Sequence, residues 1–354
     1  MIKKYIVKFN NDIDNLSLAN LANKHNFTLF KRYINCLNGA LIEMNENQYD
    51  SLKNDKNIEY IEEDKNVKIS EKKNASIDGL SFPLSSVVKP LWYQSLTNTQ
   101  INSNNHSSIN CYIVDTGINS KHIEFTTNQV ILDYSTVKGI KSANDDNGHG
   151  TKVASIIGGK NIGIANNITL HAVKVLDSTG NGSISNVISG LDWIIKNKKS
   201  NSIINMSLEA SYSAILNSAV VNCINAGIFV VCAAGNDNTD IISISPASAS
   251  NVYPIGAINS SLSKSSFSNY GGVLTFMPGE AITCAFNDAS NALYCLSDGT
   301  SFSSPITTAL IAKILLSSPS ITKTQLDIKL NTMEIINSLS NIPLNTPNQY
   351  LKYM

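Results

Sequence analysis

The sequence predicts an α/β protein in which a parallel sheet is flanked by helices and preceded by a small α+β domain. Two patterns carry this prediction. Beyond about residue 89, short and almost entirely apolar runs alternate with segments of helical periodicity, as buried parallel strands joined by helices do. Ahead of them, a shorter βαββαβ pattern fills the N-terminal region. A chain of 354 residues is long enough for both domains.

The first predicted domain, residues 1–66, switches between the apolar periodicities of strands and helices. Its expected elements are, in order, a strand at 4–9, a helix at 15–25, strands at 28–34 and 39–44, a helix at 45–55 and a strand at 58–64. This order is the split βαβ, or ferredoxin-like, arrangement.

A polar stretch at residues 67–88 separates this domain from the rest of the chain. Lys, Ser, Asn, Gly and Pro dominate it, a composition typical of an exposed linker that is open to proteolysis. We therefore place the larger domain at residues 89–354.

The larger domain contains apolar runs that are short enough for strands and too apolar to face water on either side. They lie at 111–117, 170–177, 202–208, 228–236 and 252–258, with helical patterns between them at 151–159, 183–197 and 213–227. In such a sheet, functional groups gather at the carboxyl ends of the strands. Polar residues that end or follow these runs are therefore the candidates for chemistry.

Charge and cysteine content narrow the possible partners. The 27 basic and 27 acidic residues give a formal net charge of zero, so no electrostatic argument favours a nucleic acid or an anionic membrane. No apolar stretch has the length of a membrane span. The six cysteines lack the C-x-x-C spacing of metal sites. We expect buried thiols, with Cys284 and Cys295 facing each other across a hairpin as the alternative.

Three residues at element edges have the types needed for nucleophilic catalysis. Asp115 ends an apolar strand, His149 opens a helix from a Gly-rich turn, and Ser301 precedes a helix whose first turn holds Pro305. Taken separately, each of these residues has a common structural explanation as a turn or helix-cap residue. Together they supply a hydroxyl nucleophile, a base to remove its proton, and a carboxylate to orient the base.

Asn236 adds a fourth candidate, because it follows the apolar run that ends in "VVCAAG". Acyl transfer needs hydrogen-bond donors aimed at the developing oxyanion, and a side-chain amide can supply one beside the backbone N–H of Ser301. The alternative interpretation of Asn after Gly is a turn residue.

These motifs resemble those of the subtilisin-like serine proteases, in particular the proteinase K-like branch. The stretches that carry the resemblance are "YIVDTGI", "NGHGTKVAS", "GTSFSSP" and the oxyanion segment "AAGNDN", in the chain order Asp, His, Ser. The similarity spans roughly residues 90–350. It implies a subtilisin-like sheet and a serine endopeptidase that needs no cofactor, acts as a monomer on proteins or peptides, and is made as a zymogen.

The resemblance extends to the N-terminal domain, which is similar to the inhibitory propeptide of these enzymes. Its tail, "EEDKNVKIS", is expected in the cleft in cis, with the processing bond in the polar linker. Two edge strands would grip an extended peptide by strand addition. The substrate-binding residues that the resemblance implies are Gly182, Ser183 and Ile184 on one strand, Ser207, Leu208 and Glu209 on the other, and Ala233, Ala234 and Gly235 around the first pocket.

Four positions depart from the family pattern. Lys152 stands where His is usual and Ser155 where Gly is usual, and we expect both to affect packing only. Glu209 replaces a usual Gly, and its charge is expected to disfavour substrates with an acidic residue before the scissile bond. Thr275 stands where calcium-binding relatives carry Asp; a hydroxyl lacks the charge that a hard cation favours, so structural calcium is unsupported.

Three other functions were weighed. An aspartic protease would need a second D-[TS]-G motif beside "DTG", and the sequence has none. An α/β-hydrolase esterase would need G-x-S-x-G and a different triad order. A pseudoprotease that keeps the fold and the propeptide is opposed by the presence of all four catalytic residue types.

Localisation stays open at the level of the sequence. The family is mostly secreted, yet "MIKKYIVKFNNDIDN" has neither an apolar core of secretory length nor a small-residue cleavage site. Either the chain is not exported by the usual route, or the true start lies upstream.

Overall fold

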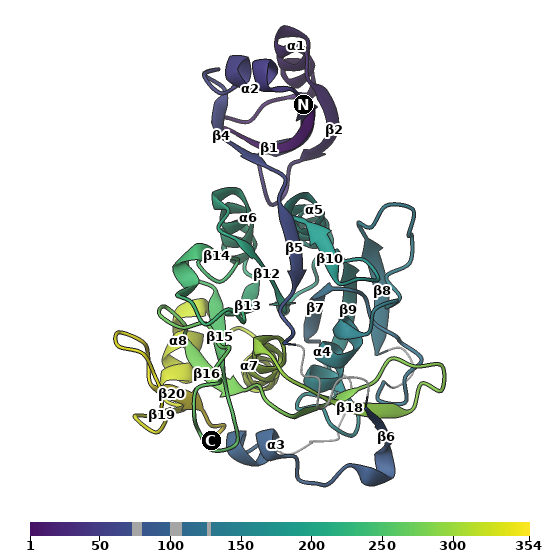
Figure 1. The fold of residues 1–354 in the computed structure, drawn as a ribbon, viewed down its shortest axis with the longest axis vertical. Helices are drawn as coiled ribbons and strands as arrows, with labels where there is room; N and C mark the ends of the chain where they lie inside the picture. Colours follow the sequence, from purple (N-terminus) through teal and green to yellow (C-terminus); the bar gives the residue numbers. More distant parts are fainter. Residues whose placement is uncertain (73–79, 100–107, 126–128) are drawn as a thin grey trace.

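A small N-terminal unit lies at one end of a larger α/β unit, and a single strand runs from the first into the second (Figure 1). The structure is a computed structural model that describes residues 1–72, 80–99, 108–125 and 129–354. Residues 73–79 of the predicted linker lie outside the described residues.

The N-terminal unit packs two helices on one antiparallel sheet. Its elements are β1 (Lys3–Phe9), α1 (Asn15–His25), β2 (Thr28–Tyr33), β3 (Gly39–Met44), α2 (Glu46–Leu52) and β4 (Ile58–Glu63). The strand order is β2-β3-β1-β4, and each neighbouring pair is antiparallel. Leu18, Leu21 and Leu52 from the helices pack on Val7 and Ile42 of the sheet, which gives this unit a core of its own. The element order is the βαββαβ order expected from the sequence.

The larger unit is built on a parallel sheet that, within the described residues, has the strand order β16-β15-β13-β11-β7-β9-β8. The strands are β7 (Asn110–Asp115), β8 (Val130–Ser135), β9 (Thr169–Lys174), β11 (Ser202–Met206), β13 (Phe229–Ala233), β15 (Tyr253–Ile258) and β16 (Thr275–Pro278). The principal helices are α4 (His149–Gly158), α5 (Ile184–Asn197), α6 (Ala214–Asn225), α7 (Thr300–Ser317) and α8 (Lys323–Asn331). This is the α/β architecture that the sequence predicts.

Two strands of the parallel sheet were not predicted, and both lie at its edges. In β8, Ile131 and Leu132 are exposed, so the strand lacks the uninterrupted apolar run of a central strand. The other edge strand, β16, ends at Pro278, and proline inside a short run argues against a strand in sequence-based prediction.

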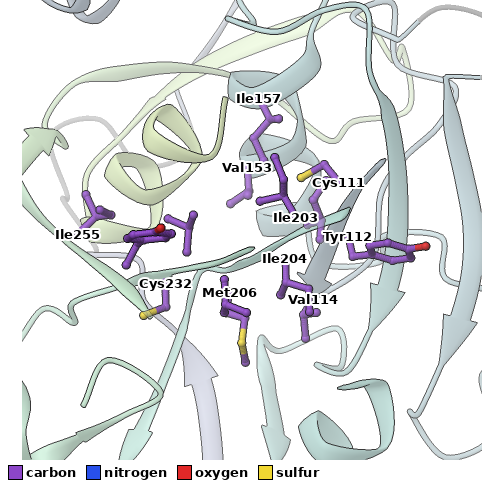
Figure 2. Packing of buried hydrophobic residues seen from close by; sticks show 14 of the residues in the cluster. Cys111, Tyr112, Val114, Val153, Ile157, Ile203, Ile204, Met206, Cys232 and Ile255 are labelled. Carbon is purple, nitrogen blue, oxygen red and sulfur yellow. The ribbon is translucent and has the colours of Figure 1, made fainter. Parts of the chain in front are cut away.

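Helices on both faces explain why the central strands are mostly apolar. In Figure 2, Ile203 points toward α4, where Val153 and Ile157 lie, whereas the next residue, Ile204, points to the opposite face. Both isoleucines are fully buried. Because successive side chains of a strand alternate between faces, a strand covered on both sides buries nearly all of its side chains. A polar residue there, such as Asn205 of β11, forms its hydrogen bonds inside the fold, with Ser207 and Thr308.

Smaller strands and helices complete the fold. They are β5 (Asn66–Ile69), β6 (Ser81–Pro83), α3 (Trp92–Thr97), β10 (Asn181–Ser183), β12 (Leu208–Ser211), β14 (Ile244–Ser245), β17 (Ile282–Ala285), β18 (Leu293–Ser297), β19 (Glu334–Ile336) and β20 (Gln349–Leu351). All six cysteines are buried thiols; Cys284 and Cys295 are register partners across β17 and β18. Among the described residues, none of the helices combines the length and the apolar character needed to cross a membrane.

The start of the predicted linker differs from the expected exposed segment. Residues 66–69 form β5, which pairs with β10 on one side and β12 on the other. Val67 is fully buried and Ser70 is 1% exposed. The polar composition misled the prediction, because the neighbouring strands satisfy the backbone of this segment and thereby allow it to be buried.

Two carboxylates next to β5 join the N-terminal unit to helices of the larger one. Glu62 accepts hydrogen bonds from the Ser213 hydroxyl and, at 3.2 Å, from the Ile215 N–H at the start of α6. Asp64 accepts from the N–H of Ser185 at 2.8 Å and from its hydroxyl at 2.6 Å, at the start of α5. Helix N-termini carry unsatisfied N–H groups and favour negative charge, so both carboxylates act as caps supplied by another unit.

We predict that Glu62→Ala and Asp64→Ala each lower the free energy of unfolding by about 0.5–2 kcal/mol, the usual cost of losing an N-cap. Urea unfolding in a Ser301→Ala background, intended to keep the chain intact, measures this. The matched control is Glu63→Ala, since Glu63 forms an exposed ion pair with Lys3, worth about 0–1 kcal/mol. Equal losses in all three variants would contradict the capping role.

Candidate active site

Asp115 and His149 are in direct contact at the carboxyl edge of the sheet. Asp115 is the last residue of β7, and its Oδ1 accepts hydrogen bonds from the N–H of Thr116 at 2.7 Å and from Nδ1 of His149 at 2.8 Å. Both side chains are fully buried. The two interactions fix the carboxylate, and the carboxylate in turn fixes the orientation of the imidazole.

A buried aspartate that the sequence analysis did not single out holds the turn before His149. Asp145 Oδ1 accepts from the Thr116 hydroxyl at 2.9 Å and from the Gly148 N–H at 2.8 Å. Its Oδ2 accepts from both the N–H and the hydroxyl of Thr151. Asp145 therefore links the Asp115 turn to the first turn of α4. Asp145 is followed by a second aspartate, Asp146, and no sequence pattern indicates which of the two has this role.

Glycine is required on both sides of His149. Gly148 has a φ of 115°, in the left-handed region that side chains disfavour. A Cβ on Gly150 would lie 2.1 Å from the carbonyl oxygen of Gly117. The Gly-rich pattern of the sequence thus reflects a tight approach between the Asp115 turn and α4.

Ser301 is the second residue of α7 and is fully buried. Its hydroxyl donates to the carbonyl oxygen of Ser207 at 3.1 Å, while its N–H donates to the carbonyl oxygen of Ser70 at 3.2 Å. The ring of the next residue, Phe302, lies 5.8 Å from the His149 ring between centroids. Nε2 of His149 is buried and lacks a hydrogen-bond partner in the described part of the chain.

Asn236 follows β13 and points its amide at the same carbonyl oxygen. Its Nδ2 donates to the Ser70 oxygen, and its Oδ1 accepts from the N–H and the hydroxyl of Thr300 at 2.9 and 3.0 Å. Thr300, which the sequence analysis missed, therefore sets which end of the amide faces Ser70. Two donors from separate elements converge on one carbonyl oxygen.

The predicted peptide-gripping strands are β10 and β12, and the peptide between them is β5. Gly182 pairs with Val67 and Ser183 with Asn66 on one side; Leu208 pairs with Ile69 and Glu209 with Lys68 on the other. The Ser70 N–H donates to the carbonyl oxygen of Ser207 at 3.1 Å. Ile184 differs from the expected strand position, because Ser183 caps α5 and Ile184 is its first residue.

The pocket around the Ser70 side chain is closed by a buried carboxylate. Glu209 is 3% exposed; its Oε2 accepts from the Ser70 hydroxyl at 2.8 Å and from the Asn236 N–H at 3.2 Å. A Cβ on Gly235 would lie 2.9 Å from this Oε2, so Gly235 forms the facing wall. The other predicted wall residues, Ala233 and Ala234, are fully buried.

Lys152 contacts the peptide segment, contrary to the expectation that it affects only packing. Its Nζ lies 2.6 Å from Oε1 of Glu71, the residue that follows Ser70. Burial alone would raise the pKa of Glu71, but attraction to Lys152 and His149 outweighs it and lowers that pKa below its ordinary value. The second departure, Ser155, donates its hydroxyl to the Lys152 carbonyl and accepts from the Ala285 N–H.

Thr275 lies apart from these residues, in β16. It is fully buried, and its hydroxyl donates to the carbonyl oxygen of Gln349 at 3.0 Å. Within the described ranges, no group of three or more His, Cys, Asp or Glu side chains is arranged to hold a metal ion.

Comparison with known proteins identifies the family of the chain. Residues 108–344 match the model of the subtilase family, Peptidase_S8. An extracellular serine proteinase of Thermus sp. (strain Rt41A) is 38% identical over 91% of this chain and 77% of its own length. A cuticle-degrading protease of Metarhizium anisopliae is 32% identical over 99% of this chain and 89% of its own.

The fold has relatives among solved structures as well. The crystal structure of a cold-adapted subtilisin-like serine proteinase superposes with a TM-score of 0.68 at 34% identity, covering 75% of this chain and 98% of the other. The chain therefore belongs to the subtilase family and is a serine-type peptidase.

Proposed function

We propose that this subtilase is a serine endopeptidase made as a zymogen, with Ser301 as nucleophile, His149 as general base and Asp115 as the group that orients His149. Asn236 and the Ser301 N–H form the oxyanion hole. Residues 1–70 act as an inhibitory propeptide, and the Ser70–Glu71 bond is the one processed. Protein and peptide chains are the substrates.

One observation carries this proposal: the Ser70 carbonyl oxygen accepts hydrogen bonds from both Asn236 Nδ2 and the Ser301 N–H. In acyl transfer, the oxygen of the attacked carbonyl becomes negatively charged, and preorganised donors must surround it. A backbone carbonyl held by two such donors beside a serine hydroxyl is in the position of the bond to be cut.

The proposed reaction begins with rotation of the Ser301 side chain away from the Ser207 carbonyl and toward Nε2 of His149. The hydroxyl oxygen attacks the Ser70 carbonyl carbon as Nε2 takes its proton. Collapse of the tetrahedral intermediate breaks the C–N bond, and His149 returns the proton to the leaving amine of Glu71. Water then hydrolyses the acyl-enzyme by the same steps. The buried Nε2, without a partner among the described residues, is consistent with this role.

Inhibition by the N-terminal unit is supported by the contacts that hold β5. The strand has neighbours on both sides, and the Glu62 and Asp64 caps anchor the unit that precedes it. After the bond is cut, the N-terminal unit still holds β5 next to the cleft. A β5 segment that leaves the cleft therefore meets it again at a high effective concentration, and it keeps other substrates out for as long as the unit remains bound.

We predict that the intact chain processes itself and that Ser301→Ala abolishes processing. N-terminal sequencing of the larger product should begin at Glu71. Once the cleaved residues 1–70 have been separated from it, a fluorophosphonate probe should label the wild type and not Ser301→Ala. The matched control is Ser303→Ala, because Ser303 donates to the carbonyls of Met277 and Pro278 instead of facing the cleft.

The outcomes of this experiment separate the alternatives. If the wild type is neither labelled nor processed, the protein is a binding scaffold. If pepstatin blocks processing and fluorophosphonate does not, the protein is an aspartic protease. A Ser301→Ala chain that still processes itself would contradict the proposed nucleophile.

Asn236→Ala should lower kcat by about 10²–10³-fold, the usual effect of removing one oxyanion donor. KM should change far less, since the donor acts mainly on the transition state. Steady-state kinetics with a peptide substrate measures both constants. A near-neutral Asn236→Ala would remove Asn236 from the oxyanion hole.

The pH dependence of processing should reflect an elevated His149 pKa. Burial lowers this pKa, but Asp115 and, more weakly, Glu71 outweigh it and raise it above the ordinary 6.5. Because only neutral His149 accepts the proton, the processing rate should still be rising with pH above 6.5. Glu71→Gln removes a charge that stabilises the imidazolium, so the acid limb of the rate profile should move to lower pH.

Rates of self-processing measured for both chains from about two pH units below to about two above the ordinary histidine pKa of about 6.5 test this pH dependence. An acid limb that stays in place, or moves to higher pH, would show that Glu71 does not stabilise protonated His149.

A further inference from the structure

We infer that this peptidase selects substrates by charge on both sides of the scissile bond, through Glu209 on the acyl side and Lys152 on the leaving side. Numbering the peptide outward from the bond, P1 is Ser70, P3 is Lys68 and P1′ is Glu71. The preferred substrate has a basic residue at P3, a small hydroxyl residue at P1 and an acidic residue at P1′. The inference rests on the proposed function, because it takes Ser70–Glu71 as the scissile bond.

The P1 preference follows from the chemistry of the pocket. The Ser70 hydroxyl donates to Oε2 of Glu209 at 2.8 Å and lies 3.1 Å from the Thr300 hydroxyl oxygen. Ser70 is 1% exposed, so these groups replace water around its side chain. A carboxylate at P1 would face Glu209 with like charge, and an apolar P1 side chain would remove a hydrogen bond from a buried carboxylate.

The P3 preference comes from the second oxygen of the same carboxylate. Oε1 of Glu209 lies 2.9 Å from Nζ of Lys68. The Lys68 side chain is 56% exposed and that of Glu209 is 4% exposed, so water screens the pair from one side. A basic P3 residue therefore compensates the buried charge, with a smaller energetic effect than a fully desolvated pair would have.

The P1′ preference rests on a more enclosed ion pair. Nζ of Lys152 and Oε1 of Glu71 are 2.6 Å apart, and the two side chains are 17% and 14% exposed. Nζ also lies 5.9 Å from the centroid of the Phe302 ring, which limits its contact with water. A neutral P1′ residue would leave a poorly hydrated ammonium group without its partner, and a basic one would add repulsion.

Both specificity residues stand where the family pattern has another residue type. The resemblance implied a substrate-binding role for Glu209, whereas Lys152 was expected to affect packing only. The same chain supplies their charge-matched partners, Lys68 and Glu71, in its own tail. Two complementary ion pairs, one on each side of the bond, together with the Ser70 hydrogen bond to Glu209 make a recognition pattern.

The first test uses peptides of the sequence NVKISEK, which is residues 66–72, and the self-processed chain after the cleaved residues 1–70 have been separated from it. Changing P1′ from Glu to Lys should lower kcat/KM by about tenfold or more, as expected for a charge-assisted hydrogen bond that is lost. Lys152→Glu should reverse this preference. Lys138→Glu, the same charge change in the exposed turn after β8, should retain it.

The acyl side is tested with the same peptides carrying Glu at P3, or Phe or Asp at P1. Wild type should prefer Lys at P3 and Ser at P1, and Glu209→Gln should weaken both preferences. Glu209→Gly should admit large apolar P1 residues. A P1 and P3 profile that Glu209→Gly leaves unchanged would overturn the Glu209 assignment.

A charge exchange within the chain gives a test that does not depend on added peptides. Glu71→Lys should slow self-processing, and Glu71→Lys combined with Lys152→Glu should restore it. Slowing without restoration, in a double variant that fluorophosphonate still labels, would overturn the Lys152 assignment.

Failure of the inference and failure of the proposed function give different results. If fluorophosphonate labels the chain and the chain cleaves peptides without regard to the charge at P3 and P1′, only the inference is contradicted. Chains that show no Ser301-dependent labelling or cleavage contradict the proposed function, and the inference with it.

Discussion

The position of one carbonyl oxygen, that of Ser70, constrains the rest of the active site. Asn236 and the Ser301 N–H reach it from the end of β13 and the start of α7. Each donor is held in turn: Thr300 fixes the amide of Asn236, and the helix fixes the N–H of Ser301. The Ser207 carbonyl, which accepts from the Ser70 N–H and from the Ser301 hydroxyl, completes the frame. Donors that are fixed before the reaction need no reorganisation when charge develops.

The parallel sheet makes this convergence possible. Asp115 and Asn236 are far apart in sequence, yet each lies at the carboxyl end of a central strand, where the edges of neighbouring strands meet. The helices α4 and α7 pack on each other, and their first turns bring His149 near Ser301, since the rings of His149 and Phe302 lie 5.8 Å apart. The apolar strands provide the rigid support, and the polar groups are confined to the ends, where their hydrogen bonds can be satisfied.

Much of this arrangement could be predicted from the sequence, because the patterns that indicate it lie within short segments of the chain. Apolar runs predicted the five central strands, since strands buried on both faces contain few polar residues. The edge strands β8 and β16 carry exposed or proline residues and were missed for the same reason. The Asp115–His149 contact was expected because the combination of a strand-end carboxylate, a Gly-flanked histidine and a helix-start serine is rare by chance.

The charged contacts could be predicted only in part: the resemblance implied that Glu209 acts on the residue before the scissile bond, but no local pattern connects Lys152 with Glu71. Lys152 and its partner Glu71 are 81 positions apart, and Glu209 meets Ser70 across 139. Polar composition around residues 67–72 suggested an exposed linker, whereas pairing with β10 and β12 buries it. Only the folded chain shows that the two atypical charges lie on opposite sides of the same peptide bond.

The central claim, that the Ser70 carbonyl occupies the oxyanion site of the intact chain, is tested most directly by a crystal structure of full-length Ser301→Ala. We expect electron density for an uncleaved Ser70–Glu71 bond, with the Ser70 oxygen within hydrogen-bond distance of Asn236 Nδ2 and the backbone N–H of residue 301. A different carbonyl at that site, or a cleft without the β5 segment, would contradict the account.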